Sequence, residues 1–286
     1  MEKRDSFDYT MMSTFMTCRR RYEYRINRGL VSKRPATALT FGGAIHEGLD
    51  SWYNDKDVDK AVKIFKEGFE QRIEEDDKRT HAMGEWILRN YHEQYKDQPW
   101  ELVASERAFE LPFRNGKKFI GRIDKIVRWG DVLWVVDHKT TSQLGSSFFK
   151  TAEPNLQFTG YTWAARQLGF PVVGIILDAI LVAKGLLPGV RKNYKLTPLA
   201  RYDVYRSEEH LKEWEDTVEG IMGDIAVCEQ KGIWYPNFDA CTYYGECPYR
   251  RVCKEDNDIR ERIIKSDYNI EHWSPLNQEK PKEVVQ

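Results

Sequence analysis

The chain has 286 residues, 31% of them charged and 41% hydrophobic, which is the profile of a soluble protein with room for one large domain or two small ones. Its formal net charge is −1, which excludes a global basic field for nucleic acid. The N-terminus lacks the apolar region of a signal peptide, and the most apolar run, 172–183, contains Asp178 and is too short to cross a bilayer. We therefore expect a cytoplasmic protein without membrane contact, or one of the host cytoplasm if the chain is viral.

Helical patterns dominate the first hundred residues. Asp8 or Thr10 is a suitable N-cap for the first helix. Apolar residues recur at helical spacing over 8–26 and 42–54 and, as two helices with a break near 78–80, over 57–96. These segments predict an N-terminal helical region over residues 1–98.

A strand pattern begins near Trp100. Asn115-Gly116 and Gly130-Asp131 are turn signals between strands. We expect strands over 100–113, 117–129, 132–139, 172–183 and 193–206, and helices over 153–168 and 207–231. The fold class is therefore α/β, with a central mixed β-sheet flanked by helices.

We expect a single domain over residues 1–265. Its sheet core spans 99–206, its C-terminal helix and cysteine region spans 207–265, and a polar tail over 266–286 is frayed or disordered.

Two acids and a lysine gather at the expected hairpin. Residues i and i+2 of a strand project to the same face, so Asp137 and Lys139 point together, and the hairpin brings Asp124 beside them. Asp137 follows the apolar run 132–136, and ligand sites tend to lie at the ends of such buried strands. Two carboxylates and an ammonium group are the minimum equipment for metal-assisted phosphodiester hydrolysis.

Other polar residues extend this site. His46 lies on a helix that can pack against the sheet, and an imidazole added to carboxylates favours manganese over magnesium. Asp50, one turn later, ranks below it. Gln157 and Tyr161 share one face of the helix over 153–168. Taken singly, each of these residues is also typical of an ordinary helix.

Five cysteines cannot all pair internally, and in a reducing compartment their clustering favours metal or cluster binding. Cys241, Cys247 and Cys253 are spaced C-x5-C-x5-C, whereas Cys18 lies far upstream. Cys228 stands apart in a predicted helix and is typical of a small buried hydrophobe.

The motifs together resemble the RecB-like PD-(D/E)XK nucleases, close to the iron–sulfur CRISPR-associated RecB-like exonucleases and the AddB nuclease domain. The resemblance covers roughly 6–253. It is carried by Gly43-x-x-His46, Gly121-Arg122-Ile123-Asp124, Asp137-His138-Lys139-Thr140 and Gln157-x-x-x-Tyr161, in the order and approximate spacing of that group.

The resemblance implies a restriction-endonuclease-like core that hydrolyses DNA. His46, Asp124 and Asp137 then hold one or two Mg or Mn ions, with the carbonyl of Val136 or His138 as a further ligand. Lys139 orients or deprotonates the attacking water. Gln157 and Tyr161 form the DNA-side wall, and Glu106 matches an acidic position often found before the hairpin.

The same resemblance implies a [4Fe–4S] cluster held by Cys18, Cys241, Cys247 and Cys253, which joins the first and last helices. The more familiar spacing is C-x2-C-x5-C, so zinc stays an alternative. Two basic groups near these cysteines are candidate DNA contacts: Arg19, Arg20 and Arg21, and Arg250 and Arg251.

Three functions remain open. The leading one is a metal-dependent DNA exonuclease acting on single strands or duplex ends in recombination, repair or CRISPR-type processing. The alternative is a non-catalytic DNA-binding subunit of a recombination complex. A small-molecule metalloenzyme or redox protein is disfavoured by the basic and aromatic stretches 19–24 and 243–251. No P-loop is present, so any motor activity must come from a partner such as a helicase or recombination protein.

Overall fold

The computed structural model describes residues 4–72, 76, 78–187, 198–242, 246–272 and 274–276. The chain divides into two compact units. Of the described residues, the sheet unit contains those within 36–107 and 122–211, and the cysteine unit contains those within 4–35, 108–121 and 212–276. Among the described helices, none combines the length and the hydropathy needed to cross a membrane. That residues 1–265 form a single domain stays a prediction.

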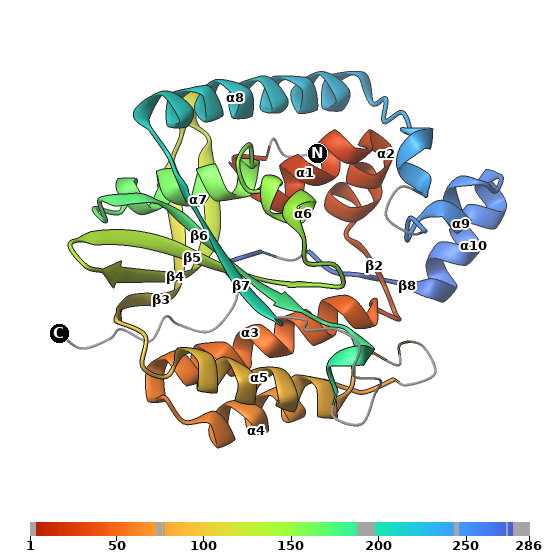
Figure 1. Cartoon of the computed structure of the whole chain (residues 1–286). Helices are drawn as coiled ribbons and strands as arrows, with labels where there is room; N and C mark the ends of the chain where they lie inside the picture. The colour runs from red at the N-terminus through yellow and green to blue at the C-terminus, as the bar shows by residue number, and fades with distance from the viewer. Residues whose placement is uncertain are drawn as a thin grey trace. The chain divides into compact units, whose positions relative to one another are not determined.

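The sheet unit is built on a mixed β-sheet, as expected (Figure 1). β4 and β5 form an antiparallel hairpin, β5 and β6 run parallel, and β6 and β7 run antiparallel. Gly130 has a φ of 61° in the tight turn of the hairpin, a conformation that glycine adopts without strain. The strands are β3 (Trp100–Pro112), β4 (Lys118–Trp129), β5 (Val132–Thr141), β6 (Val172–Leu181) and β7 (Leu199–Tyr205).

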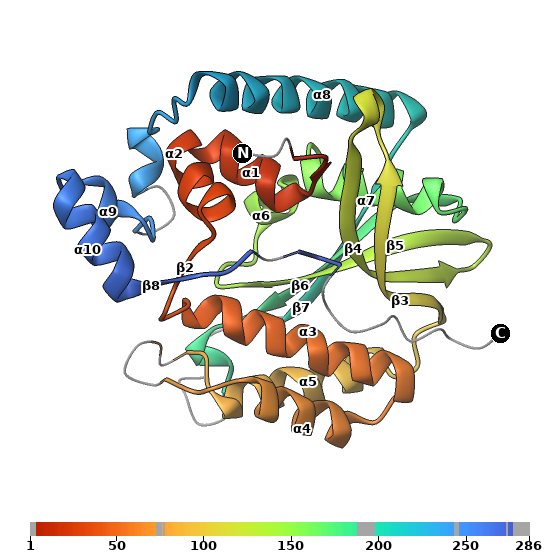
Figure 2. The same cartoon turned by 180° about the vertical axis from the view of Figure 1, so that it is seen from behind.

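Helices cover both faces of this sheet (Figures 1 and 2). Three helices lie together on one face: α3 (Thr37–Asp55), α4 (Val58–Gly68) and α5 (His81–Tyr95). α7 (Leu156–Gln167) packs on the other face against β5 and β6, and α6 (Ser146–Lys150) precedes it. Parallel strands cannot be joined by a tight turn, and α7 lies in the crossover between β5 and β6.

The helical bounds differ from the sequence predictions in this unit. α3 begins at Thr37, well before the predicted residue 42, and η3 (Lys184–Leu186) is a 3₁₀ turn after β6. Two helices occupy 57–96 as predicted, but the first ends at Gly68, because Phe69 turns away into the core formed by the three helices. The first part of the predicted strand 193–206 lies outside the described residues, and its second part is β7.

The cysteine unit is mainly helical. β1 (Ser6–Phe7) pairs in parallel with the first residues of β4, and β2 (Leu30–Ser32) pairs antiparallel with β8 (Tyr268–Ile270). The helices are α1 (Tyr9–Thr17), α2 (Arg19–Tyr22), the π-helical η1 (Glu23–Asn27), α8 (Glu208–Lys231), the 3₁₀ turn η4 (Phe238–Cys241), α9 (Arg250–Cys253) and α10 (Asn257–Asp267). A core cluster is formed by Tyr24, Leu30, Tyr249, Val252, Ile263, Ile264 and Tyr268.

Two predictions are wrong in this unit. The helix expected over 8–26 begins as predicted, with Asp8 accepting a bond from the Met11 N–H at 2.8 Å, but it breaks at Cys18. Cys18 is extended, with φ −166° and ψ 122°. The tail expected from residue 266 is ordered at its start, because 268–270 form β8.

Gly84 of α5 provides a test of the helical packing. A Cβ at this position would lie 2.0 Å from the Phe65 ring, which is held by Phe41 and Phe69. We expect Gly84→Ala to lower the free energy of unfolding by about 1–3 kcal/mol. The control is Gly220→Ala in α8, where a Cβ meets nothing and helix propensity predicts a gain of about 0.5–1 kcal/mol. Urea titration measures both, and equal effects would contradict the packing.

Candidate active site and cysteine pocket

The β4–β5 hairpin brings the two aspartates together. The last paired residues of the hairpin are Lys125 and Val136, so Asp124 and Asp137 follow next to each other. The backbone N–H of His138 donates to Asp124 Oδ2 at 3.1 Å. Lys139 Nζ lies 2.7 Å from Asp137 Oδ2. The predicted convergence of these residues is therefore present.

His46 reaches this group from α3. Its Nδ1 lies 3.3 Å from Asp124 Oδ2. Gly42, one turn earlier, allows the helix to approach β5, since a Cβ there would lie 3.2 Å from Thr140 Oγ1. Burial chiefly lowers the pKa of His46 to about 4, although the Asp124 carboxylate opposes that shift. The imidazole is therefore neutral at physiological pH, the form that binds metals.

Burial and neighbouring charges shift the pKa values of the two aspartates. Burial raises the pKa of Asp137 to about 7, with a further contribution from Asp124 and opposition from Lys139. Burial resists ionisation of Asp124 as well, but His46 and Lys139 outweigh it and hold the pKa of Asp124 below its ordinary value. A site with these shifts favours an added cation.

Three residues ranked low or overlooked in the sequence belong to the same cluster. Burial, and then Asp124, raises the pKa of Glu106 to about 8. The φ of Glu106 is 48°, a conformation that is uncommon for a non-glycine residue in a strand. Lys125 is only 1% exposed, and its Nζ lies 3.4 Å from Asp50 Oδ1, which also accepts a hydrogen bond from Ser105. The sequence offers one sign of the Lys125–Asp50 pair, which is a lysine at a position of β4 where the pattern is otherwise apolar.

Gln157 and Tyr161 share one face of α7, as predicted. Gln157 Nε2 donates to the Tyr161 hydroxyl at 3.1 Å. Lys139 Nζ lies 5.9 Å from the centre of the Phe158 ring on the same helix. α7 thus borders the lysine, whereas a DNA-side wall formed by Gln157 and Tyr161 stays a prediction.

A profile of the PD-(D/E)XK nuclease superfamily matches residues 7–254. The chain belongs to this superfamily. Among solved structures, a protein from Eubacterium rectale that is provisionally described as an exonuclease is similar at 14% identity and a TM-score of 0.51, covering 90% of this chain and 92% of that one. This likeness supports the fold. The protein SSO0001 shares 16% identity over 89% of this chain and 88% of its own, with a TM-score of 0.41. No curated protein matches the chain.

The superfamily membership raises the question of whether this site fits a metal ion. The ligand types fit magnesium or manganese, and the 3.3 Å between His46 and Asp124 suits adjacent ligands, which lie about 3 Å apart on an octahedral ion. The third ligand is engaged elsewhere, since Asp137 pairs with Lys139. Accordingly, within the described parts of the chain, no three His, Cys, Asp or Glu side chains are grouped to hold an ion.

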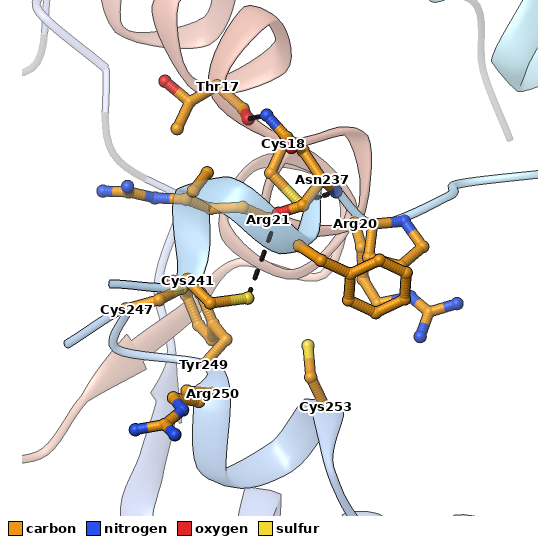
Figure 3. A pocket seen from close by; sticks show the side chains of 13 residues that line it. Thr17, Cys18, Arg20, Arg21, Asn237, Cys241, Cys247, Tyr249, Arg250 and Cys253 are labelled. Atoms are coloured by element: carbon orange, nitrogen blue, oxygen red, sulfur yellow. Dashed lines mark hydrogen bonds between the residues drawn. The ribbon is translucent and has the colours of Figure 1, made fainter. Parts of the chain in front are cut away.

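The four predicted cysteines line one cavity of about 40 Å³ in the cysteine unit. Figure 3 shows the sulfurs of Cys18, Cys241 and Cys253 pointing toward the same space. Asn237 supports the helix break at Cys18: its backbone N–H donates to Cys18 Sγ at 3.3 Å, and its side chain donates to the Thr17 carbonyl at 3.1 Å. The break therefore turns Cys18 toward the C-terminal cysteines.

Two of the four thiols are affected electrostatically by the others. Burial raises the pKa of Cys253 to about 11 and that of Cys247 above its ordinary range, and Cys18 and Cys241 add to both shifts. A cationic centre would stabilise the thiolates. Zinc needs at least three thiolates around one ion and a [4Fe–4S] cluster needs four, and among the described residues no three such side chains are gathered to hold an ion. Cys228 is buried on α8 and does not line the cavity.

Four of the five arginines predicted to contact DNA have partners within the cysteine unit. Arg19 lies over the Phe15 ring at 4.8 Å and over the Tyr235 ring at 5.4 Å. Arg20 donates to the Trp234 carbonyl, Arg250 pairs with Glu246, and Arg251 pairs with Asp267. Arg20, Arg21 and Arg250 also line the cysteine cavity, whereas residues 243–245 of the predicted aromatic stretch lie outside the described residues.

The raised carboxyl pKa values predict opposite effects of pH on metal affinity and on stability. Asp137 and Glu106 hold protons below about pH 7 and 8, and these protons must leave when a cation binds. We expect Mn²⁺ affinity to rise between pH 6 and 8, by up to about tenfold per unit for each proton released. The metal-free fold binds more protons than the unfolded chain in this range, so its stability falls as pH rises.

Electron paramagnetic resonance of free Mn²⁺ measures the affinity, and thermal unfolding measures the stability. Glu106→Gln should make both pH profiles shallower, because the Asp137 proton is still released. Glu101→Gln, on the exposed part of the same strand, should leave them unchanged. An affinity that is constant from pH 6 to 8 would contradict the assignment.

Proposed function

We propose that the protein is a RecB-like, metal-dependent DNA exonuclease that hydrolyses phosphodiester bonds in single strands or at duplex ends. The observation that carries this proposal is the convergence of Asp124, Asp137 and Lys139 at one hairpin, with His46 3.3 Å from Asp124. Membership of the PD-(D/E)XK nuclease superfamily supports nuclease activity. Exonuclease action is supported by the similar structure from Eubacterium rectale, which is provisionally described as an exonuclease.

In this proposal His46, Asp124 and Asp137 hold one or two Mg or Mn ions. A bound ion would lower the pKa of the attacking water and would place a positive charge beside the scissile phosphate. Lys139 orients that water as an ammonium group, or takes its proton as the neutral amine and thereby becomes the ammonium. In either case the ammonium group stabilises the charge that develops on the phosphate. Its pairing with Asp137 in the metal-free site keeps the lysine beside a carboxylate that is proposed to hold the ion.

Gln157 and Tyr161 form the polar wall next to the DNA backbone, through the hydrogen-bonded pair on α7. Contacts to the backbone do not read sequence, so we expect digestion without sequence specificity. Arg19 to Arg21 and Arg250 to Arg251 add phosphate contacts, and a helicase or recombination protein supplies any motor activity.

The second part of the proposal is a [4Fe–4S] cluster on Cys18, Cys241, Cys247 and Cys253. It is supported by the single cavity that these thiols line and by the helix break at Cys18. The role of the cluster is structural, because the cysteines hold together the first and last helical segments of their unit.

Lys139→Ala tests the nuclease directly. We expect end-labelled DNA to be degraded in Mn²⁺ or Mg²⁺ but not in chelator, and the substitution to lower the rate by about 10²–10³-fold through loss of transition-state charge stabilisation. Lys63→Ala, an exposed lysine of α4, is the control and should retain full activity. DNA binding without degradation by the folded wild type would instead favour a non-catalytic subunit.

Cys247→Ser tests the cluster. In protein purified without oxygen, we expect the wild type to contain iron and acid-labile sulfide with cluster absorption in the visible range, and the variant to lose both. Cys228→Ser should retain them, since this cysteine lies outside the cavity. Zinc in the wild type in place of iron would reject the cluster and support a zinc site on the same cysteines. Absence of any metal would reject a metal site of either kind.

A further inference from the structure

A row of polar side chains crosses three strands next to the candidate active site. The register of β5 and β6 pairs His138 with Asp178, and that of β6 and β7 pairs Asp178 with Arg201. His138 is 1% exposed and Asp178 is fully buried. The proposed reaction uses none of these side chains, so the buried row requires another explanation.

The carboxylate of Asp178 is held from two sides. Arg201 Nε donates to Oδ2 at 3.1 Å, and the Tyr91 hydroxyl donates to the same oxygen at 2.5 Å. The Tyr53 hydroxyl lies 2.8 Å from that of Tyr91. The Arg201 guanidinium also lies 3.5 Å from the centre of the Tyr95 ring. Side chains of α3 and α5 thereby enclose the ion pair on the sheet.

A buried ion pair is weak evidence for stability. Removing two charges from water costs free energy that their attraction often fails to recover, and apolar residues of similar size often serve as well. The bonds from Arg201 and Tyr91 to Asp178 Oδ2 do, however, fix this carboxylate in one arrangement. The row is therefore better explained by what it positions than by what it stabilises.

His138 links this row to the active site. Its Nδ1 lies 3.5 Å from Asp178 Oδ2, and neither ring nitrogen has a hydrogen-bond partner within the described part of the chain. The ring packs edge-on against His46, with 5.9 Å between the ring centres. The backbone N–H of the same residue donates to Asp124 Oδ2. A displacement of His138 would consequently disturb both His46 and Asp124.

We propose that Asp178, Arg201 and Tyr91 are positioning residues for the active site. They hold His138, whose backbone orients Asp124 and whose ring packs against His46. The inference rests on the proposed function, in which Asp124 and His46 bind the metal ion. It adds a network on β6, β7 and α5 that sets the geometry of the ligands without touching the substrate.

Two conservative substitutions test this role. Asp178→Asn keeps the shape and removes the charge, whereas Tyr91→Phe removes only the hydroxyl that bonds Asp178. We expect Asp178→Asn to weaken Mn²⁺ binding, measured by electron paramagnetic resonance, by about tenfold. This is the lower end of the effect of losing a direct outer partner of a metal ligand, because Asp178 acts through His138. kcat should fall with it while the KM for DNA stays within about twofold. Tyr91→Phe should give a smaller loss in the same direction.

Tyr95→Phe is the matched control. This tyrosine lies on the same helix and packs against Arg201, but its hydroxyl accepts from Gln94 rather than bonding Asp178. We expect its Mn²⁺ affinity and kcat to equal those of the wild type. Unchanged Mn²⁺ affinity in Asp178→Asn and Tyr91→Phe, with only a lower melting temperature, would overturn the proposal.

A second measurement is independent of metal and activity. Hydrogen exchange of the His138 amide, followed by NMR in metal-free protein and normalised to the buried Ile175 amide, reports the bond to Asp124. We expect faster exchange in Asp178→Asn and Tyr91→Phe and no change in Tyr95→Phe. Unchanged exchange in all three would reject the positioning role.

Failure of the wild type to bind Mn²⁺ or cleave DNA would reject the proposed function, while the exchange of the His138 amide still decides whether the row positions His138. If Asp178→Asn does not fold, Tyr91→Phe decides.

Discussion

The antiparallel pairing of β4 with β5 is the constraint on which the candidate site depends. It places Asp124 next to Asp137 in the second half of β5, where the His138 N–H donates to the Asp124 carboxylate and Lys139 pairs with Asp137. Because side chains alternate along a strand, a slip of one residue would turn these groups to the other face of the sheet. The tight turn at Gly130 and the apolar residues of both strands oppose such a slip.

This arrangement places several ionisable carboxyl groups in a buried site that water hardly reaches. Burial raises the pKa values of Asp137 and Glu106, while His46 and Lys139 lower that of Asp124 despite its burial. The two carboxyl groups with raised pKa values reduce stability when ionised in the absence of a cation, and they favour the binding of one. The same physical feature therefore accounts for the expected loss of stability with rising pH and for the expected gain of metal affinity.

The two sets of candidate ligands illustrate different routes to a site. In the sheet unit, a hairpin and one helix bring carboxylates and an imidazole together, and α3 approaches closely because Gly42 has no side chain. In the cysteine unit, Cys18 joins the C-terminal cysteines because α1 breaks where Asn237 replaces the helical bonding pattern. The first route follows local pattern, whereas the second depends on a residue more than two hundred positions away.

The sequence by itself determined the hairpin, the face shared by Asp137 and Lys139, the helix face shared by Gln157 and Tyr161, and the mixed sheet, because these features follow from periodicity and turn chemistry over short distances. Only the tertiary structure decided the break at Cys18, the strand at 268–270, the burial of Lys125 and the row from His138 to Arg201. Each of these depends on partners distant in sequence, whose contacts override local propensity: Asn237 at Cys18, β2 at the tail, Asp50 at Lys125, and two tyrosines of α3 and α5 at Asp178.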